Sequence, residues 1–565
     1  MIEKIKNFIS EKKIDGYLIS KNDKYFTEYS KTSYLKDVSN FSGSAGFALI
    51  LKDKNYLFVD GRYTLQAKKQ SGKKFTIFEI PYIWPKNLFN KKNKKLKIGF
   101  DPTLFTYNKL NSYFESTCNL IPLKTNLFDD SEEKNILNKN KYFILNNKVS
   151  GENSKSKIQK IIKYLKNKKI NNLFVSAGEN VCWLLNIRGN DLPNSPVANC
   201  RLIVSKSGNI YFFSNIKKIS KIKKKFKNIN ISFHGENEIF KILNNLKDHS
   251  FCIDGQTCSV FHEELINSKF KVIDRIDPIY YFKSIKNKIE IKNIIKAHIE
   301  DGVALTKFIY WLKNQNINNI TEIGVEKKLE AFRKKNKNYL YPSFETIAGS
   351  GPNGAIIHYR SNKSTNRKLN YKELLLVDSG GQYKWGTTDV TRTLCFSNIS
   401  QKIKKIFTRV LQGHISVASA NINKLSTGHD LDKAARKSLN SIGLNYRHGT
   451  GHGVGYFLNV HEGPQSISKN NKVKLREGMV VSNEPGYYLE NSFGIRIENL
   501  VFIKKNGKNL CFENLTLAPI EKNLIDFKML TKSEKDYLFN YHLNVYSKIS
   551  PYLNKNEKKW LIKSI

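Results

Sequence analysis

The sequence predicts a mixed α/β (α+β) protein of about three domains, in which two similar smaller domains precede a larger one. The length of 565 residues corresponds to three or so average domains. A strand–turn–strand pattern at residues 47–60 recurs at residues 201–214. In the last half, apolar residues at helical spacing alternate with short apolar runs that are typical of strands.

The first domain is expected over residues 1–127. An amphipathic helix within the first nine residues leads directly into a strand at 17–19, and no apolar core of a signal peptide is present. The segments 41–46 and 60–63 combine glycine with polar residues, but no Walker lysine follows them. We therefore interpret both segments as tight turns of a scaffold.

The second domain is expected over residues 140–281, after a polar linker at 129–134. An amphipathic helix around residues 158–165 precedes a strand at 173–175, and the repeated strand–turn–strand pattern follows. The first two domains are therefore predicted to be related, each with a mixed sheet.

The third domain is expected over residues 285–565. Apolar residues at steps of three and four predict a long helix over 291–312 and further helices over 403–415 and 431–439. The tail from about residue 520 is predicted to be a helical extension that serves as an extra packing layer. Its expected apolar positions are Tyr537, Leu538, Tyr541, Leu543, Tyr546 and Ile549.

The stretch from His448 to Glu498 combines histidines, acids and many glycines, which disfavour a helix. We predict an extended segment, in which His448 and His452 share a face because side chains alternate along a strand. A strand around residues 495–498 should likewise direct Arg496 and Glu498 into one polar site.

Two further acids lie upstream of this stretch. Asp378 ends an apolar run of strand type, and the chain returns through Asp389. A hairpin with its turn near residues 380–384 would place these two acids on neighbouring strands. The candidate site therefore contains Asp378, Asp389, His452, Glu484 and Glu498.

Four carboxylates and one imidazole indicate a pair of metal ions. A structural zinc site is usually richer in cysteine or histidine, and four carboxylates carry too much charge for one divalent ion. Hard oxygen donors with a single histidine favour manganese, with cobalt, iron and zinc as alternatives. Two such ions can hold a bridging water as hydroxide at neutral pH, so the chemistry implied is hydrolysis.

The order of these residues, with two aspartates eleven apart, a histidine, and two glutamates fourteen apart, resembles the pita-bread metallopeptidases. The flanking residues 448–455, 459–464 and 484–488 resemble the Xaa-Pro aminopeptidases (aminopeptidase P) of the long, cytosolic, three-domain type. The resemblance covers nearly the whole chain. It implies two creatinase-like α/β domains before a pita-bread catalytic domain, two manganese ions, and a homodimer formed through the catalytic domains.

The resemblance also implies an activity, the removal of an N-terminal residue that precedes proline, and roles for individual residues. Asp378 would hold one ion, His452 and Glu484 the other, and Asp389 and Glu498 would bridge. Glu484 would shuttle a proton, while His358 and His461 would stabilise the developing oxyanion. His448 and Arg496 would line the proline side with support from Tyr488, although Arg496 could instead orient a ligand carboxylate. The first two domains would serve dimer geometry and substrate access.

Two alternatives remain at this point. One is a different enzyme of the same fold, such as a prolidase, a methionine aminopeptidase or a creatinase. A binding module of the same fold without catalysis would suit the net charge of +46.

Charge and composition bound the remaining expectations. Lysines are spread along the whole chain without a recognisable nucleic-acid module, so we expect only weak, non-specific binding to polyanions. No apolar run is long enough for a transmembrane helix, which predicts no membrane contact. Seven scattered cysteines with no metal-binding spacing suggest a reducing compartment, and we expect the cytoplasm.

Overall fold

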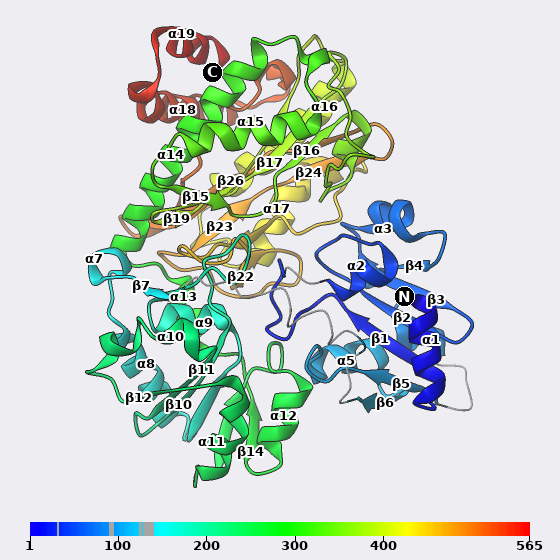
Figure 1. Ribbon diagram of the computed structural model, residues 1–565. Helices are drawn as coiled ribbons and strands as arrows, with labels where there is room; N and C mark the ends of the chain where they lie inside the picture. Colours follow the sequence, from blue (N-terminus) through cyan, green and yellow to red (C-terminus); the bar gives the residue numbers. More distant parts are fainter. Residues whose placement is uncertain (31–32, 90–94, 124–126, 128–140) are drawn as a thin grey trace. The chain divides into compact units, whose positions relative to one another are not determined.

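The computed structural model describes residues 1–30, 33–89, 95–123, 127 and 141–565. The expected linker at 129–134 lies outside the described residues. The chain folds into two compact units (Figure 1). The first unit comprises Met1–Asn147 and Glu152–Tyr280, and the second comprises Lys148–Gly151 and Tyr281–Ile565.

The first unit begins with a six-stranded mixed sheet. Its strands are β1 (Gly16–Ser20), β2 (Phe47–Leu51), β3 (Asn55–Asp60), β4 (Thr76–Ile80), β5 (Lys97–Phe100) and β6 (Asn119–Pro122). They lie in the order β4-β3-β2-β1-β5-β6, and β2 is antiparallel to both neighbours while the outer pairs are parallel. The accompanying helices are α1 (Ile2–Glu11), α2 (Tyr34–Ser39), α3 (Thr64–Ser71), α4 (Pro85–Phe89) and α5 (Tyr107–Phe114). The predicted amphipathic helix is α1, which buries Ile5, Phe8 and Ile9.

A second six-stranded sheet follows. Its strands are β8 (Asn172–Val175), β10 (Cys200–Ser205), β11 (Ile210–Ser214), β12 (Ile231–His234), β13 (Ser250–Ile253) and β14 (Lys271–Asp274). The accompanying helices are α8 (Ser154–Asn167), α9 (Gly178–Leu184), α10 (Ile216–Ile219), α11 (Ile239–Asn245), α12 (Val260–Asn267) and α13 (Pro278–Ser284). A short pair, β7 (Phe143–Ile144) with β9 (Ile187–Arg188), completes this region. The short helix α7 (Asn147–Ser150) belongs mostly to the second unit.

The second sheet repeats the topology of the first. Its order is β12-β11-β10-β8-β13-β14, with β10 antiparallel to both neighbours and the outer pairs parallel. The predicted repeat is thus confirmed, and its two strand–turn–strand patterns are the hairpins β2–β3 and β10–β11.

The second unit starts with a long helix, α14 (Lys288–Lys313). Asn287 caps it, because its side chain accepts hydrogen bonds from two backbone amides, while the Glu290 carboxylate accepts one from the Asn287 amide. The predicted apolar stripe is buried at its centre and end, as at Phe308 and Leu312. The next helix is α15 (Glu322–Lys334).

Three sheets of the second unit carry the site. The first, β16-β17-β20, consists of β16 (Ile347–Ser350), β17 (Leu375–Ser379) and β20 (Val390–Leu394). The second, β22-β21-β23-β26-β27, consists of β21 (Gly451–Gly453), β22 (Glu462–Ile467), β23 (Val480–Asn483), β26 (Asn499–Asn506) and β27 (Asn509–Asn514). The third is the hairpin β24 (Gly486–Leu489) with β25 (Phe493–Arg496). A further small sheet holds β15 (Tyr339–Pro342), β18 (Gly381–Tyr383) and β19 (Gly386–Thr387).

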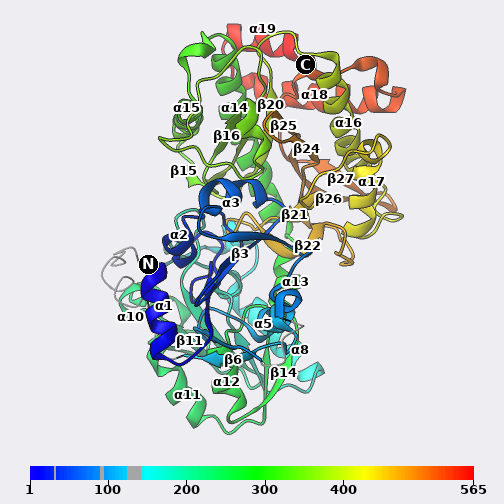
Figure 2. The same ribbon diagram turned by 90° about the vertical axis from the view of Figure 1, so that its right-hand side faces the viewer.

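Helices flank these sheets, as predicted (Figure 2). The predicted helices after residue 400 are α16 (Gln401–Ala418) and α17 (Gly428–Asn440). The tail forms α18 (Lys532–Ile549) and α19 (Lys555–Ser564), which contact α14. One expected apolar position is wrong, since Leu543 is 53% exposed while Val545 is fully buried. Across the described residues, no helix has both the length and the apolar character needed to cross a bilayer.

Candidate metal centre

The two aspartates lie at the same end of an antiparallel strand pair. Asp378 faces Thr391 across β17 and β20, and Asp389 directly precedes β20. The chain between them is not the simple hairpin that was expected. Its strands β18 and β19 turn at residues 384–385 and pair in the sheet of β15. The predicted proximity of the two acids is nevertheless present.

The two glutamates also share one end of a strand pair. Asn483 of β23 faces Asn499 of β26, while Glu484 directly follows the first and Glu498 directly precedes the second. The predicted continuous strand through residues 495–498 is wrong, because β25 ends at Arg496 and β26 starts at Asn499. This interruption allows Glu498 to leave the hairpin β24–β25 and reach the five-stranded sheet.

The glycines beside His452 allow its strand to approach its neighbours. A Cβ atom on Gly451 would lie 1.9 Å from the carbonyl oxygen of Ser482, and one on Gly453 would lie 2.0 Å from that of Glu462. Any larger residue would therefore separate β21 from β22 and β23. His452 sits between these glycines, with its Nδ1 2.9 Å from the Gly453 carbonyl oxygen. Its Nε2 is thereby directed at the acids.

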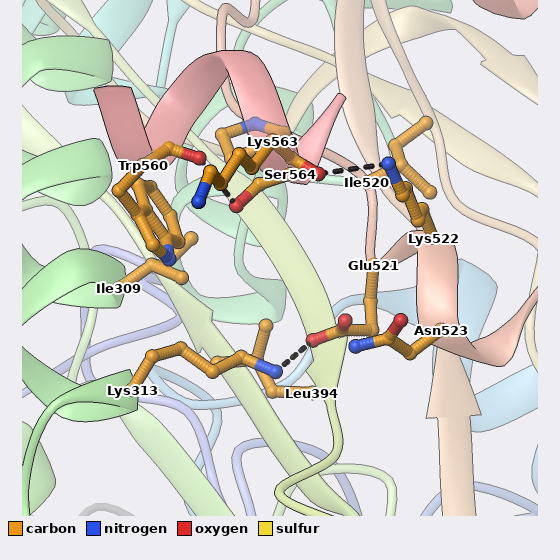
Figure 3. Close-up of a pocket in the computed structure, with 11 residues that line it drawn as sticks. Ile309, Lys313, Leu394, Ile520, Glu521, Lys522, Asn523, Trp560, Lys563 and Ser564 are labelled. Atoms are coloured by element: carbon orange, nitrogen blue, oxygen red, sulfur yellow. Dashed lines mark hydrogen bonds and ion pairs between the residues drawn. The ribbon is translucent and has the colours of Figure 1, made fainter. Parts of the chain in front are cut away.

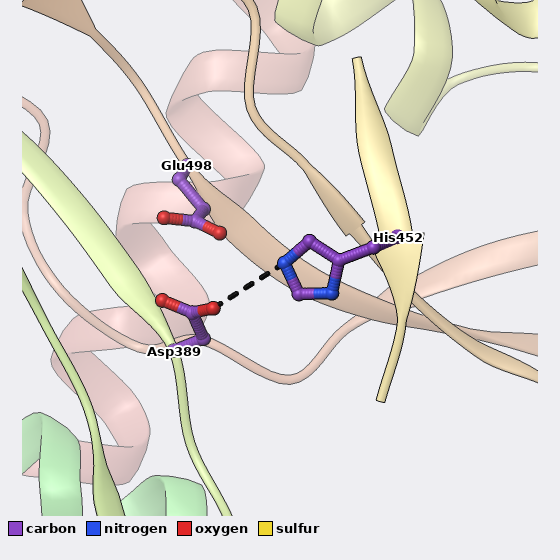
Figure 4. A group of neighbouring side chains, drawn as sticks. All are labelled: Asp389, His452 and Glu498. Carbon is purple, nitrogen blue, oxygen red and sulfur yellow. Dashed lines mark ion pairs between the residues drawn. The ribbon is translucent and has the colours of Figure 1, made fainter. Parts of the chain in front are cut away.

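The side chains of Asp389, His452 and Glu498 converge (Figure 4). One potential ligand atom from each lies within 4.8 Å of the others. His452 Nε2 is 3.4 Å from Asp389 Oδ2 and 3.6 Å from Glu484 Oε1. The structure thus brings four of the five predicted ligands directly together.

The fifth predicted ligand, Asp378, belongs to the same electrostatic cluster. Burial, followed by the charge of Asp378, raises the pKa of Asp389 well above its ordinary value. The pKa of Glu498 is also well above its ordinary value, because of burial, then Asp389, then Glu484. Burial raises the pKa of Glu484 in the same direction. Crowded buried carboxylates of this kind need positive charge beside them to ionise together.

The donor set fits divalent metal ions. Oδ1 of Asp378 is buried and accepts no hydrogen bond from the described residues, so it is available as a ligand. A buried carboxylate oxygen without a partner is unfavourable unless a cation binds it. Oxygen donors from four carboxylates with one imidazole suit hard or borderline divalent ions.

Arg496 connects Asp378 to the predicted substrate side. This fully buried guanidinium donates to Asp378 Oδ2 at 2.6 Å, to Thr391 Oγ1 at 3.0 Å and to the Tyr488 hydroxyl at 2.7 Å. The Tyr488 hydroxyl in turn lies 2.9 Å from His448 Nε2. Of the two roles considered for Arg496, orienting a ligand carboxylate has direct contacts here.

The two remaining histidines lie at different places. The ring centroid of His461 is 4.2 Å from that of His452, and the rings are nearly perpendicular. His461 is therefore beside the cluster. His358 follows the 3₁₀ turn Gly351–Ala355 and is partly buried. The 3₁₀ turn before His358 contacts the hairpin β24–β25, because the backbones of Gly354 and Gly494 touch. A Cβ atom on Gly494 would lie 1.8 Å from the Gly354 carbonyl oxygen.

Sequence reasoning missed several residues that hold the ligands. Thr391 Oγ1 donates to Glu498 Oε2 at 2.7 Å. Ser482 Oγ donates to Glu484 Oε1 at 3.1 Å and accepts from the His452 amide at 2.8 Å. Both residues are fully buried. The available signal was a small hydroxyl residue two positions from a predicted ligand, within a short strand.

A separate cavity of about 110 Å³ lies between α14 and the C-terminal segment (Figure 3). An ion pair between Lys313 and Glu521 crosses it, and Lys522 Nζ donates to the Lys563 carbonyl oxygen at 2.8 Å. None of the described residues that line it is a candidate ligand.

Family models match nearly the whole chain. The model of metallopeptidase family M24 matches residues 292–505, and that of the C-terminal region of peptidase M24 matches residues 508–565. Two models of the creatinase/prolidase N-terminal domain match residues 1–129 and 133–290. The predicted creatinase-like domains and the predicted metallopeptidase domain are therefore confirmed.

Individual relatives extend over the same length. The chain is 36% identical to a probable Xaa-Pro aminopeptidase P of Laccaria bicolor, over 99% of this chain and 92% of that protein. It is 35% identical to Xaa-Pro aminopeptidase 1 of Dictyostelium discoideum, over 99% and 95%.

Solved structures give the same picture. The X-prolyl aminopeptidase of Caenorhabditis elegans, described as a cytosolic enzyme with a di-nuclear active site, superposes with a TM-score of 0.91 at 30% identity, over 98% of this chain and 95% of that one. The prolidase of Pyrococcus horikoshii covers only 65% of this chain, with a TM-score of 0.54 and 27% identity.

Proposed function

The chain belongs to metallopeptidase family M24 and, within it, to the Xaa-Pro aminopeptidases, and from this premise we propose that it cleaves the bond between an N-terminal residue and a following proline. The observation that carries the proposal is the convergence of Asp389, His452 and Glu498 within 4.8 Å, with Glu484 beside them. The matched relatives and the matched structure with a di-nuclear active site support it.

We propose that Asp378, Asp389, His452, Glu484 and Glu498 hold two divalent ions. The preponderance of carboxylate oxygen favours manganese over cobalt, iron or zinc. These residues would hold ions that, when bound, would supply hydroxide near neutral pH by lowering the pKa of a water molecule. The charge of the ions would then offset the burial and, after it, the mutual repulsion that raise the pKa values of Asp389 and Glu498.

The protein groups around this centre have separate tasks. Glu484 is held by Ser482 and is proposed to accept and return the proton of the attacking water. His461, beside His452, is proposed to donate a hydrogen bond to the scissile carbonyl oxygen as negative charge develops, and His358 to assist it. Arg496 keeps Asp378 in place, while its contact with Tyr488 fixes that residue against His448 on the substrate side.

Proline recognition follows from the same side of the centre. Proline has a fixed φ and no amide hydrogen, so a pocket can select it by shape. We propose that His448, Tyr488 and Arg496 form this pocket. The hydrogen bonds among these three side chains would hold the pocket in one shape, which suits selection by shape.

A prolidase-like dipeptidase is the second candidate. The observation in its favour is the structural match to the prolidase of Pyrococcus horikoshii at 27% identity. The prolidase structure covers 65% of this chain, whereas the X-prolyl aminopeptidase structure covers 98%, and this difference favours the aminopeptidase. A binding module of the same fold is disfavoured by the complete set of five ligands.

The proposal extends to partners and location. Peptides with proline at the second position would be the substrates, and a homodimer formed through the catalytic domains would be the assembly. A cytoplasmic location is supported by the C. elegans enzyme, which is described as cytosolic. No specific nucleic acid partner is proposed, because the positive charge is distributed along the whole chain.

The test compares three peptides on the purified full chain loaded with Mn²⁺. We expect cleavage of the first bond in an Xaa-Pro-Yaa tripeptide, much slower cleavage of Xaa-Ala-Yaa, and little cleavage of the dipeptide Xaa-Pro. Preference for the dipeptide would favour the prolidase reading. Failure to cleave any of them with two ions bound would favour the binding module.

A further inference from the structure

A second buried arginine, Arg392, lies directly behind the proposed ligands. It is 2% exposed and sits on β20. Its Nη1 donates to the carbonyl oxygens of Glu498 at 2.6 Å and Thr391 at 2.8 Å, and its Nη2 donates to Asn499 Oδ1 at 2.8 Å. Because Thr391 Oγ1 also donates to the Glu498 carboxylate, this arginine fixes the backbones of two residues whose side chains meet at the metal centre.

The other contacts of Arg392 are made with the C-terminal segment. Its Nε donates to the Pro519 carbonyl oxygen at 3.0 Å, and its Nη2 donates to the Ala518 carbonyl oxygen at 3.0 Å and to the Tyr541 hydroxyl at 2.8 Å. Tyr541 is on α18, is 4% exposed, and donates its own hydroxyl proton to Ala518 O at 2.7 Å. The C-terminal helix therefore contacts a group that touches Glu498.

The positive charge of Arg392 is compensated by neutral polar groups. Every hydrogen bond that it makes to the described residues ends on a carbonyl, amide or hydroxyl oxygen, and none ends on a carboxylate. A buried cation held only by neutral dipoles depends on all of them for its position and its solvation. Loss of the Tyr541 hydroxyl should therefore displace the guanidinium, and Glu498 with it.

We propose that Tyr541 is a positioning residue for the metal centre, acting through Arg392 on Glu498. The C-terminal extension is then part of the metal site's support in addition to being a packing layer. The proposal rests on the proposed function, because Glu498 is a metal ligand only within it. Partners that orient metal ligands typically contribute ~10–100-fold to metal affinity, and Tyr541 acts one residue further out.

The test measures Mn²⁺ affinity of the metal-free full chain by competition with a chelator, without use of activity. Tyr541→Phe removes only the hydroxyl, and we expect its affinity for Mn²⁺ to fall by about tenfold, the lower end of that range. Tyr142→Phe is the matched control. Tyr142 is also buried, at 1% exposed, and its hydroxyl donates to Asp191 at 2.7 Å in the first unit.

Each outcome decides between the explanations. Weaker Mn²⁺ binding by Tyr541→Phe with unchanged binding by Tyr142→Phe supports the proposal. Equal affinities of Tyr541→Phe and the wild type overturn it, and so does an equal loss in both variants, which would indicate general destabilisation. A wild type that binds no Mn²⁺ would instead overturn the proposed function itself.

Two further measurements keep the proposal testable if Tyr541→Phe folds poorly. Arg392→Lys retains the charge, but a single ammonium group cannot reach all the acceptors that the guanidinium contacts. This variant should weaken Mn²⁺ binding more than Tyr541→Phe. Unchanged affinity in Arg392→Lys would refute the coupling. Peptidase activity of Tyr541→Phe should also return toward the wild-type kcat as the Mn²⁺ concentration rises, and activity that stays low with two ions bound would contradict a role in metal positioning.

Discussion

Replacing Glu462 with glutamine should destabilise the protein more than removing either of the two lysines beside it. Glu462 is 5% exposed, and Lys283 and Lys286 are 2% and 4% exposed. Lys286 Nζ lies 2.8 Å from one carboxylate oxygen of Glu462, and Lys283 Nζ lies 3.2 Å from the other. One buried carboxylate thus compensates two buried ammonium groups.

This count of charges sets the expected magnitudes. Glu462→Gln leaves two neighbouring ammonium groups without a counter-charge, and breaking a buried pair in this way costs ~3–5 kcal/mol. Lys286→Met leaves a neutral pair of Lys283 with Glu462. It loses one hydrogen bond to a charged group, ~1.5–3 kcal/mol, but it also removes the repulsion between the lysines. We therefore expect Glu462→Gln to cost about 2 kcal/mol more than Lys286→Met, from the difference of these ranges.

Urea unfolding at pH 7 measures the difference. The surface pair of Lys504 with Glu513, 2.7 Å apart and about half exposed, provides a control in Glu513→Gln, which should cost less than ~1 kcal/mol. If Lys286→Met is as destabilising as Glu462→Gln, the excess positive charge of these three residues does not determine the cost, and the prediction is wrong.

The same triad has a pH dependence. Burial raises the pKa of Glu462, but the two lysines outweigh it and hold the pKa below its ordinary value. A carboxylate with a lowered folded pKa stabilises above its unfolded pKa of ~4.3, and this contribution is lost as the pH falls through the folded value. Stability of the wild type should therefore decline below about pH 4.3 by a contribution that Glu462→Gln lacks.

Four further predictions concern metal, catalysis, acid stability and charge. Asp389→Ala should lose metal and activity together, because this residue is proposed to bridge both ions; two ions retained by elemental analysis would contradict the assignment. His461→Ala should keep both ions but lower kcat ~10²–10³-fold, since loss of one donor to a developing oxyanion costs that much; a variant that loses half its metal would make His461 a ligand. Burial, then the charges of Arg392 and Lys522, lower the pKa of His542 to about 4. The unfolded chain therefore takes up this proton at a higher pH than the folded chain, and the free energy of unfolding should fall by ~1.4 kcal/mol per pH unit below ~6.5. In urea unfolding at pH 7 and pH 5, His542→Gln should lose less stability than the wild type, and an equal loss would mean that other groups cause the pH dependence. Long DNA should bind weakly and lose binding steeply with salt, and tight, sequence-selective binding in a gel-shift assay would revive the binding-module alternative.

The sequence predicted the elements whose signals are local. The helix α14 carries its apolar steps of three and four residues within a few turns, so this spacing alone located it. The repeated sheets were predictable because the hairpins β2–β3 and β10–β11 each occupy one short stretch. The proposed ligands could be selected because an ordered set of acids with a histidine beside glycines has few structural explanations.

Features that depend on distant parts of the chain were not predictable. The role of Arg392 depends on Glu498 and Tyr541, which lie 106 and 149 residues away in sequence. The break between β25 and β26 is caused by the pairing of Asn499 with Asn483 in another sheet. Leu543 was expected to be buried, but the helix turns His542 and Val545 inward, since polar His542 accepts a hydrogen bond from the Ile520 amide.

The proposed ligands come from two separate sheets. Asp378 and Asp389 belong to the strand pair β17–β20, whereas His452, Glu484 and Glu498 lie on or beside the five-stranded sheet. Ions held between them would join two sheets of the second unit that are otherwise linked here by hydrogen bonds, such as those from the Glu498 amide to the Thr391 carbonyl oxygen and from Thr391 Oγ1 to the Glu498 carboxylate. An ion that binds only the folded chain stabilises it by ~4 kcal/mol at a thousandfold excess over its dissociation constant. In a cell, the supply of metal would then govern the lifetime of this protein against proteolysis as well as its turnover of peptides, and starvation for the ion would deplete the enzyme itself.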